Sequence, residues 1–520
     1  MKNKINIQSI SLIVTIALII GACSDELLDQ SNNNATSTSN FGTSVSQVEA
    51  AVNGAFHPLT NTFFWGRIIH TGAMLRSDEF NVFPFGSNTA MSTFQGNPGD
   101  RWATEPWQQL YKSIARSNNI IINTTEEGIP DTTTRNNLVG QAYFLRGFSY
   151  WYLVNLYGSV PLITDLPDLD NLAVEQASVD AIWKQIIEDF EMAETMLPTS
   201  WEGSNLGRPT AGAATAFKGK SYLYMKDWTN AHQTLSTLVG KYNLLPSENY
   251  SDNFTTTNEN NEESIFELQF LGQDTFVWGT DIPGTGTMGN YHIDYAPPTK
   301  SPDNSHLVNP WLKNLFEAEG DVVRRNETLA YDYPGSTGYG NTDFLTDFAA
   351  DIEVAETAGL QAIFSKKYAG LDLGVRADVD FLGTNVGNNW RIMRYADVLL
   401  MLAEALNEDG QTTQAIQFID MVRERAELPL ISDTNPGISQ ADFRNAVINE
   451  RAMELAGEGH RFFDLVRWDL ADDYLGANSL HGAHPKSLSG GTFQTGKHEL
   501  IWIPNSELDA NTNLKQNPGY

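Results

Sequence analysis

Residues 392–426 have the sequence IMRYADVLLMLAEALNEDGQTTQAIQFIDMVRERA. Apolar residues recur at helical spacing on both sides of an Asp-Gly turn, which predicts helices over 392–406 and 413–426. The small residues Ala403 and Ala415 lie 12 positions apart across this turn. Small residues at such a spacing let two antiparallel helices pack closely, as in tetratricopeptide units. The stretch therefore predicts a helical hairpin.

The same hairpin spacing occurs at Gly219 and Ala231, and Gly147 begins a third unit whose second helix would follow an insertion at 158–178. The units do not recur at the ~34-residue period of a simple tetratricopeptide solenoid. We expect a mostly α fold in which tetratricopeptide-like helical hairpins form a scaffold. Apolar periodicity predicts further helices over 45–56, 107–124, 138–157, 179–197, 211–225, 229–239 and 440–456.

Two long regions between the helices, at about 61–101 and 247–389, are rich in loop-forming residues. Within the second region, residues 264–270 alternate like a strand. Function concentrates in loops that a rigid scaffold holds in place. We therefore expect a loop-rich variable side with minor β structure, and we expect ligand to bind there.

The charge balance narrows the choice of partner. The 520 residues include 64 Asp and Glu against 33 Lys and Arg, which gives a net charge of -31. Such a field repels phosphate backbones, so nucleic acid is not an expected partner, whereas a neutral sugar would feel little of it. The single cysteine excludes a thiolate zinc site, and neither a His-Glu-x-x-His nor a P-loop pattern occurs. No cofactor and no metal are expected.

The N-terminus has the pattern of a secretory signal. Two lysines precede a short apolar run, and residues 20–23 read Ile-Gly-Ala-Cys. This run resembles a bacterial lipobox, in which Cys23 would be acylated and become the new N-terminus. We expect residues 1–22 to be a signal peptide, residues 23–40 a lipidated flexible tether, and residues 41–520 a single domain.

Several motifs along the chain carry a family resemblance. They are RYADVLLMLAEA at 394–405, NERAMELAGEGHRFFDLVRW at 449–468, WIP at 502–504, LKQNPGY at 514–520, AYFLR at 142–146 and YGSVPL at 157–162. Together they resemble the SusD/RagB family (SusD-like proteins), and the resemblance extends over nearly the whole mature chain.

The resemblance implies four tetratricopeptide-like units on one side of the fold and a variable, ligand-binding side. It implies a lipoprotein of the outer membrane that faces the outside of a Bacteroidetes-type cell and takes part in polysaccharide utilisation. Such a protein captures oligo- or polysaccharide and delivers it to a TonB-dependent (SusC-like) transporter. A peptide or another nutrient remains open as the ligand.

The charged motif at 449–468 allows two interpretations. Glu450 and Glu454 could form the carboxylate pair of a helical glycoside hydrolase. Alternatively, the acids and bases of this motif, which are nearly equal in number, form ion pairs that fix the helix ends. We favour the second interpretation, so no catalytic residue is expected and the protein is not expected to be an enzyme.

Aromatic side chains in polar loops are the best candidates for ligand contacts. A sugar ring presents C–H faces that stack on aromatic rings, while its hydroxyl groups bond to Asn, Asp and Arg. Ordinary packing remains the alternative for any single ring. We expect Trp65, Trp278 or Tyr291 to stack on sugar rings, with Asp78 and Asn81 as polar contacts. The full set of predicted ligand-binding residues is Phe64, Trp65, Asp78, Phe80, Asn81, Phe83, Trp278, Tyr291 and Tyr295.

Overall fold

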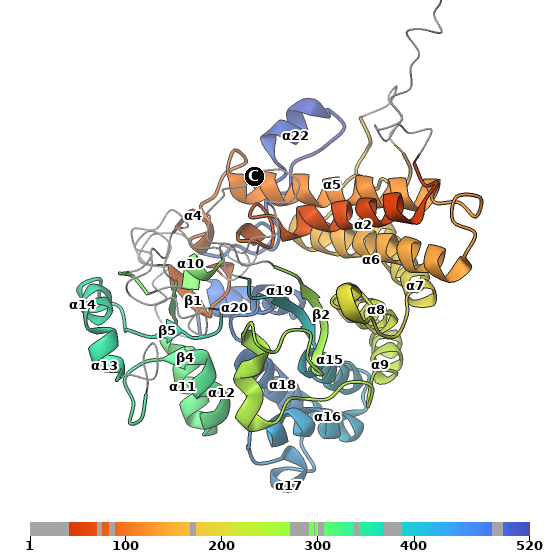
Figure 1. Cartoon of the computed structure of the whole chain (residues 1–520). Helices are drawn as coiled ribbons and strands as arrows, with labels where there is room; N and C mark the ends of the chain where they lie inside the picture. The colour runs from red at the N-terminus through yellow and green to blue at the C-terminus, as the bar shows by residue number, and fades with distance from the viewer. Residues whose placement is uncertain are drawn as a thin grey trace, which may run out of the picture.

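The computed structural model describes residues 41–69, 75–82, 89–166, 173–270, 291–295, 297–299, 306–336, 343–368, 387–480 and 492–520. Helices predominate in these residues, and the strands are few and short, so the predicted mostly α fold is confirmed. Figure 1 shows the long helices gathered at the right and the shorter elements at the left.

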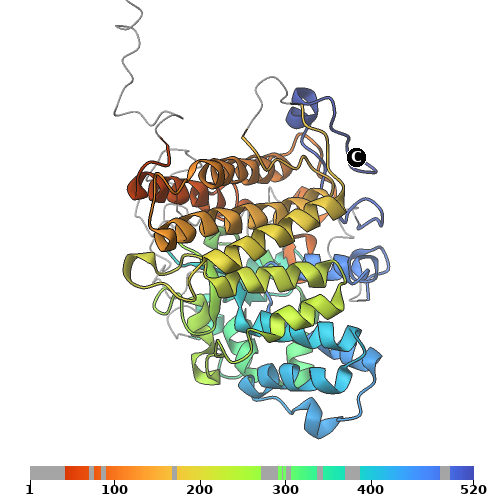
Figure 2. The same ribbon diagram turned by 90° about the vertical axis from the view of Figure 1, so that its right-hand side faces the viewer.

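Eight helices form a stack in which each helix packs on the next one along the chain. The turned view in Figure 2 shows the stack running in chain order from one end of the molecule to the other. Most of these helices begin within a few residues of the predicted positions. Their bounds are α2 (Val45–Thr60), α5 (Arg101–Asn123), α6 (Thr132–Tyr157), α7 (Val179–Met196), α8 (Ala211–Tyr224), α9 (Trp228–Ser236), α15 (Tyr395–Glu408) and α16 (Thr412–Arg425).

Small residues bring paired helices close together, as the hairpin spacing predicts. A Cβ added at Gly219 of α8 would collide with Leu235 of α9. A Cβ added at Gly147 of α6 would lie 3.2 Å from the Phe190 ring of α7, so α7 is the predicted second helix displaced beyond the insertion. The predicted tetratricopeptide-like packing is therefore confirmed for these pairs.

The predicted strand at 264–270 corresponds to β2 (Ser264–Leu268), which pairs antiparallel with β6 (Trp390–Arg394). The prediction of a helix from residue 392 is wrong at its first turn, because residues 392–394 belong to β6 and α15 begins at Tyr395. Ile392 fits the apolar periodicity of the helix, but the backbone here pairs with β2, with Arg394 opposite Ser264.

The loop-rich side contains a small antiparallel sheet in the order β1-β3-β5-β4. Leu307 of β3 and Phe364 of β5 join Phe344 and Phe348 in a second, smaller hydrophobic core. The helices here are too short to produce a long periodic signal.

The remaining elements of the described residues are β1 (Phe80–Val82), α4 (Thr89–Ser92), η2 (Gly203–Asn205), η3 (Ser247–Phe254), α10 (His292–Tyr295), β3 (His306–Val308), α11 (Pro310–Glu319), α12 (Val322–Thr328), β4 (Leu329–Ala330), α13 (Phe344–Asp347), α14 (Ala349–Thr357), β5 (Phe364–Ser365), α17 (Ile431–Thr434), α18 (Gln440–Glu454), α19 (Arg461–Arg467), α20 (Ala471–Leu475) and α22 (Asn505–Ala510).

The C-terminal segment packs against the middle of the scaffold. Ile501 donates its N–H to the carbonyl of Leu156 near the end of α6, at 2.8 Å. The Asn517 amide donates to the carbonyls of Tyr157 and Ile501. Among the described residues, no helix combines the length and the apolar character that crossing a membrane requires.

Candidate functional site

The predicted ligand contacts from two distant loop regions come together around one tryptophan. The ring centroid of Trp390, in β6, lies 5.6 Å from that of Trp65, 5.1 Å from Tyr291 and 6.1 Å from Tyr295. Phe80 of β1 lies 6.2 Å from Tyr295. We call this group the aromatic cluster, and its members are Phe64, Trp65, Phe80, Tyr291, Tyr295 and Trp390.

A ring that stacks on a sugar must be open to solvent, whereas the predicted rings of this cluster are buried. The exposed fraction is 0% for Phe64 and Tyr291, 1% for Tyr295, 2% for Phe80 and 4% for Trp65. Neighbouring rings meet them edge to face, and the hydroxyls of Tyr291 and Tyr295 donate to backbone carbonyls. Each of these aromatic side chains has a large apolar surface, and burying it stabilises the fold more than leaving the rings in solvent would. Contact between these rings and a ligand stays a prediction.

The predicted polar contacts also lie inside the protein. Asp78 accepts two hydrogen bonds from Arg461, at 2.9 and 3.0 Å, and its side chain is fully buried. Asn81, in β1 opposite Leu307, is 3% exposed. A buried carboxylate requires a charged partner, which explains why Asp78 faces inward. The remaining candidates Phe83, Trp278 and Cys23 lie outside the described residues.

Glu79, which lies between Asp78 and Asn81 in the sequence, has an unusual electrostatic environment. Burial, with the neighbouring charge of Asp78 as the next cause, raises the pKa of Glu79 from 4.5 to about 8. Its carboxylate accepts a hydrogen bond from the Gly457 N–H at 3.3 Å. The loop at 75–82 is thus tied to the charged motif in the C-terminal third of the chain.

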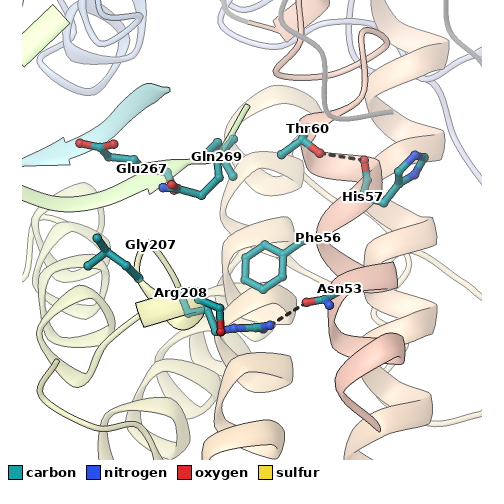
Figure 3. A pocket seen from close by; sticks show the side chains of 11 residues that line it. Asn53, Phe56, His57, Thr60, Gly207, Arg208, Glu267 and Gln269 are labelled. Carbon is teal, nitrogen blue, oxygen red and sulfur yellow. Dashed lines mark hydrogen bonds between the residues drawn. The ribbon is translucent and has the colours of Figure 1, made fainter. Parts of the chain in front are cut away.

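An open pocket of about 340 Å³ lies beside the aromatic cluster. Three segments line it: the C-terminal half of α2, the turn at 204–208 that begins within η2, and the end of β2. Figure 3 shows Phe56 of α2 at the centre of the hollow, facing Arg208 of the turn. A volume of ~300–1,000 Å³ is usual for a small-molecule site. We treat this pocket, and not the aromatic cluster, as the candidate site.

Arg208 fixes one wall of the pocket. Its guanidinium donates at 2.9 Å to three side-chain amide oxygens, those of Asn205, Gln141 and Asn53. These acceptors belong to the turn, to α6 and to α2, so one side chain holds the turn against two scaffold helices. Partial burial lowers the pKa of Arg208 below its usual value, and the charge of nearby Glu49 opposes this shift.

The opposite wall is held by amide side chains at the end of β2. Gln269 and Asn260 exchange two hydrogen bonds of 3.0 Å, and the Asn389 amide donates to Gln269 at 2.8 Å. Asn389 precedes Trp390, which lies opposite Leu268 in the β2–β6 ladder. The pocket wall is therefore continuous with the backbone that carries the aromatic cluster.

This arrangement suits a polar ligand that also has apolar faces. The partly exposed ring provides a stacking surface, and the guanidinium of Arg208 has five N–H donors, of which three are used in the bonds above. Sequence reasoning missed Phe56 because it lies on a helix with an apolar face, where an aromatic residue is counted as core. Arg208 was missed because its partners are distant in sequence. The sequence did contain one signal for this site, because Trp201 is followed closely by the glycines of the turn.

The charged motif is a buried ion-pair network. Glu450 and Glu454 are both 0% exposed, and Arg324 contacts both carboxylates. Burial alone would raise the pKa of Glu454, but the nearby arginines hold it well below its usual range. Neither carboxylate reaches solvent. The two carboxylates that the hydrolase interpretation requires are therefore engaged in ion pairs that stabilise the fold. The network contains Glu263, Asp321, Arg324, Lys367, Arg394, Arg423, Arg425, Glu450, Glu454 and Glu458.

In the part of the chain that the structure describes, no three His, Cys, Asp or Glu side chains are grouped so that they could hold a metal ion.

Two family models match the chain. The model for the SusD family matches residues 376–520, and the model described as starch-binding, associating with the outer membrane, matches residues 27–223. The SusD-like protein P2 of Formosa agariphila is 27% identical over 98% of this chain and 99% of its own length.

Solved structures have the same fold. A SusD superfamily protein of Bacteroides vulgatus superposes with a TM-score of 0.77 at 25% identity, covering 92% of this chain and all of the other. A laminarin-binding SusD-like protein superposes with a TM-score of 0.71 at 27% identity, covering 91% of this chain and 99% of its own.

Proposed function

The chain belongs to the SusD-like family, and we propose that it is a glycan-binding protein of the outer membrane. Support comes from the N-terminal family model, whose description combines starch binding with the outer membrane. Further support comes from the laminarin-binding relative, which is similar over nearly its whole length. Both point to carbohydrate as the class of ligand.

The observation in this chain that carries the proposal is the pocket at the 204–208 turn. It combines a partly exposed ring, Phe56, with the guanidinium of Arg208 and the amide of Gln269. An apolar wall with a few fixed polar groups is the usual make-up of a small-ligand site. Phe83 and Trp278 remain proposed as further ligand contacts.

We further propose the route by which the protein reaches and serves the membrane. Residues 1–22 direct export, acylated Cys23 anchors the protein, and residues 23–40 tether a single domain that spans 41–520. The anchored protein holds glycan at the cell surface and passes it to a TonB-dependent (SusC-like) transporter. Its role is capture and not cleavage, since the carboxylates of the charged motif are engaged in ion pairs.

The test is a binding screen of the mature protein, purified from membranes in detergent, against an array of polysaccharides and a library of peptides. We expect binding to one class of glycan and to no peptide. Selective binding of peptides would replace carbohydrate by peptide as the nutrient. New reducing ends that accumulate during incubation with the bound glycan would contradict the assignment as a binding protein.

A further inference from the structure

A second hollow lies on the other side of the 204–208 turn. Its volume is about 160 Å³, and Trp201, Tyr242 and Asn260 are among the residues that line it. Leu206, Gly207 and Arg208 line both hollows. The turn is therefore a ridge between two depressions of one continuous surface.

The ridge is firmly held. Gly207 has a φ of +89°, in the left-handed region that favours glycine, and a Cβ added there would collide with the amide of Gln269, just after β2. Beneath the crest, Arg208 bonds to Asn53 of α2 and Gln141 of α6. A ridge fixed from both sides keeps the two hollows at a constant spacing.

Apolar surface continues across the ridge. Leu206 at its crest is 54% exposed. Phe56 lies in the first hollow and Trp201 in the second, and both rings are partly exposed. The Trp201 indole N–H donates to the Pro209 carbonyl at 2.8 Å, which fixes the ring. Three apolar surfaces thus follow one another over the ridge.

Polar groups flank these surfaces on both sides of the ridge. Arg208 and Gln269 border the first hollow, and Ser200 and Asn260 border the second. A chain of sugar units presents the same alternation, because each ring has C–H faces and a rim of hydroxyl groups. Successive units could cover the exposed crest while their hydroxyls bond to Arg208 on one side and Ser200 on the other.

Size favours a ligand that occupies both hollows. The second hollow, at about 160 Å³, is smaller than the ~300 Å³ at which ligand pockets usually begin, so it is too small to act alone. Building on the proposed function, we propose that the ligand is an extended glycan chain that straddles the 204–208 ridge and contacts Phe56 and Trp201 at once. Affinity then depends on chain length.

The experiment is calorimetric titration of the mature protein with glucan oligosaccharides of increasing length. The probes are the laminaribiose-to-laminarihexaose series, chosen because a relative binds laminarin, and the maltose-to-maltohexaose series. Trp201→Ala and Leu206→Ala test the second hollow and the crest. Leu345→Ala is the matched control, since Leu345 is 50% exposed and lines neither hollow. Trp201→Phe keeps a ring and controls for loss of fold.

We expect affinity in the series that binds to rise with length until the chain spans the ridge. Trp201→Ala should weaken binding of the hexasaccharide ~5-fold or more, by analogy with stacking on aromatic side chains. It should leave disaccharide binding unchanged, and Trp201→Phe should restore most of the loss. Leu206→Ala should also weaken binding of the hexasaccharide, and Leu345→Ala should leave the affinity unchanged.

Two outcomes separate this inference from the proposed function. If glycan binds with the same affinity at all lengths, or if Trp201→Ala weakens short and long ligands equally, the straddling chain is wrong while glycan binding stands. If neither these series nor any glycan of the array binds, the proposed function fails and this inference fails with it.

Discussion

Replacing Glu454 by glutamine removes one charge from the centre of the buried ion-pair network. Oε1 of Glu454 lies 2.8 Å from Arg394 and 2.5 Å from Arg425, and Oε2 lies 3.1 Å from Arg324. All four side chains are at most 3% exposed. Glutamine keeps the shape but not the charge, so three cations lose part of their compensation.

The expected cost follows from this burial. Removal of one partner from a buried ion pair costs ~3–5 kcal/mol, because the remaining charge stays buried without compensation. Long chains change their melting temperature by ~2 °C per kcal/mol, so we expect a decrease of ~6–10 °C. The comparison variant is Glu188→Gln, whose pair with Lys184 is exposed (51% and 80%) and should contribute less than ~0.5 kcal/mol.

Thermal denaturation of both variants and the wild type, followed by circular dichroism, measures the difference. Because the folded-state pKa of Glu454 is depressed, its contribution is present above its ordinary value of 4.5 and is lost as pH falls through the folded pKa. The gap between wild type and Glu454→Gln should therefore narrow in acid. A melting temperature equal to that of Glu188→Gln at neutral pH would refute the structural role of the network.

Three further predictions concern other parts of the chain. Cys23→Ala should abolish acylation, and labelling of the variant by a fatty-acid probe would contradict the proposed anchor. Trp65→Ala should destabilise the fold by ~3–5 kcal/mol in denaturant titration, because this ring is core; an unchanged stability would restore Trp65 as an open contact. Since the pKa of Glu79 is raised from 4.5 to about 8, its contribution to stability is full below 4.5 and is lost as pH rises through 8. The Glu79→Gln variant cannot lose this contribution, so its melting temperature should rise relative to that of the wild type between about pH 5 and about pH 9. A difference between the two melting temperatures that stays constant over this range would contradict the raised pKa.

The helical scaffold could be predicted because its signals are local. Apolar periodicity placed the long helices, and the small residues at Gly147 and Gly219 predicted which helices pack in pairs. The error at residues 392–394 arose because strand partners in β2 decide the backbone there, and Phe266 and Ser264 lie 127 and 130 positions from Met393 and Arg394. Such a partner leaves no mark in the periodicity of the segment itself.

The candidate site could be predicted only in part. The two loop regions do meet, as the ring contacts of Trp65 and Tyr291 with Trp390 show. Whether a loop aromatic faces solvent or interior depends on tertiary neighbours, which is why the burial of these rings could not be predicted. Arg208 gains its role from Asn53 and Gln141, and a contact between such distant positions has no sequence signature.

We propose that this chain binds glycan at the pocket between α2, the 204–208 turn and β2. The most direct measurement is calorimetric titration of the glycan selected by the array into the wild type and Phe56→Ala, with Tyr333→Ala as a control for a partly exposed ring outside both hollows. We predict that Phe56→Ala weakens binding by ~5- to 150-fold, the equivalent of ~1–3 kcal/mol of stacking, while its fold and the affinity of Tyr333→Ala stay unchanged. Wild-type affinity in a folded Phe56→Ala protein would contradict the claim.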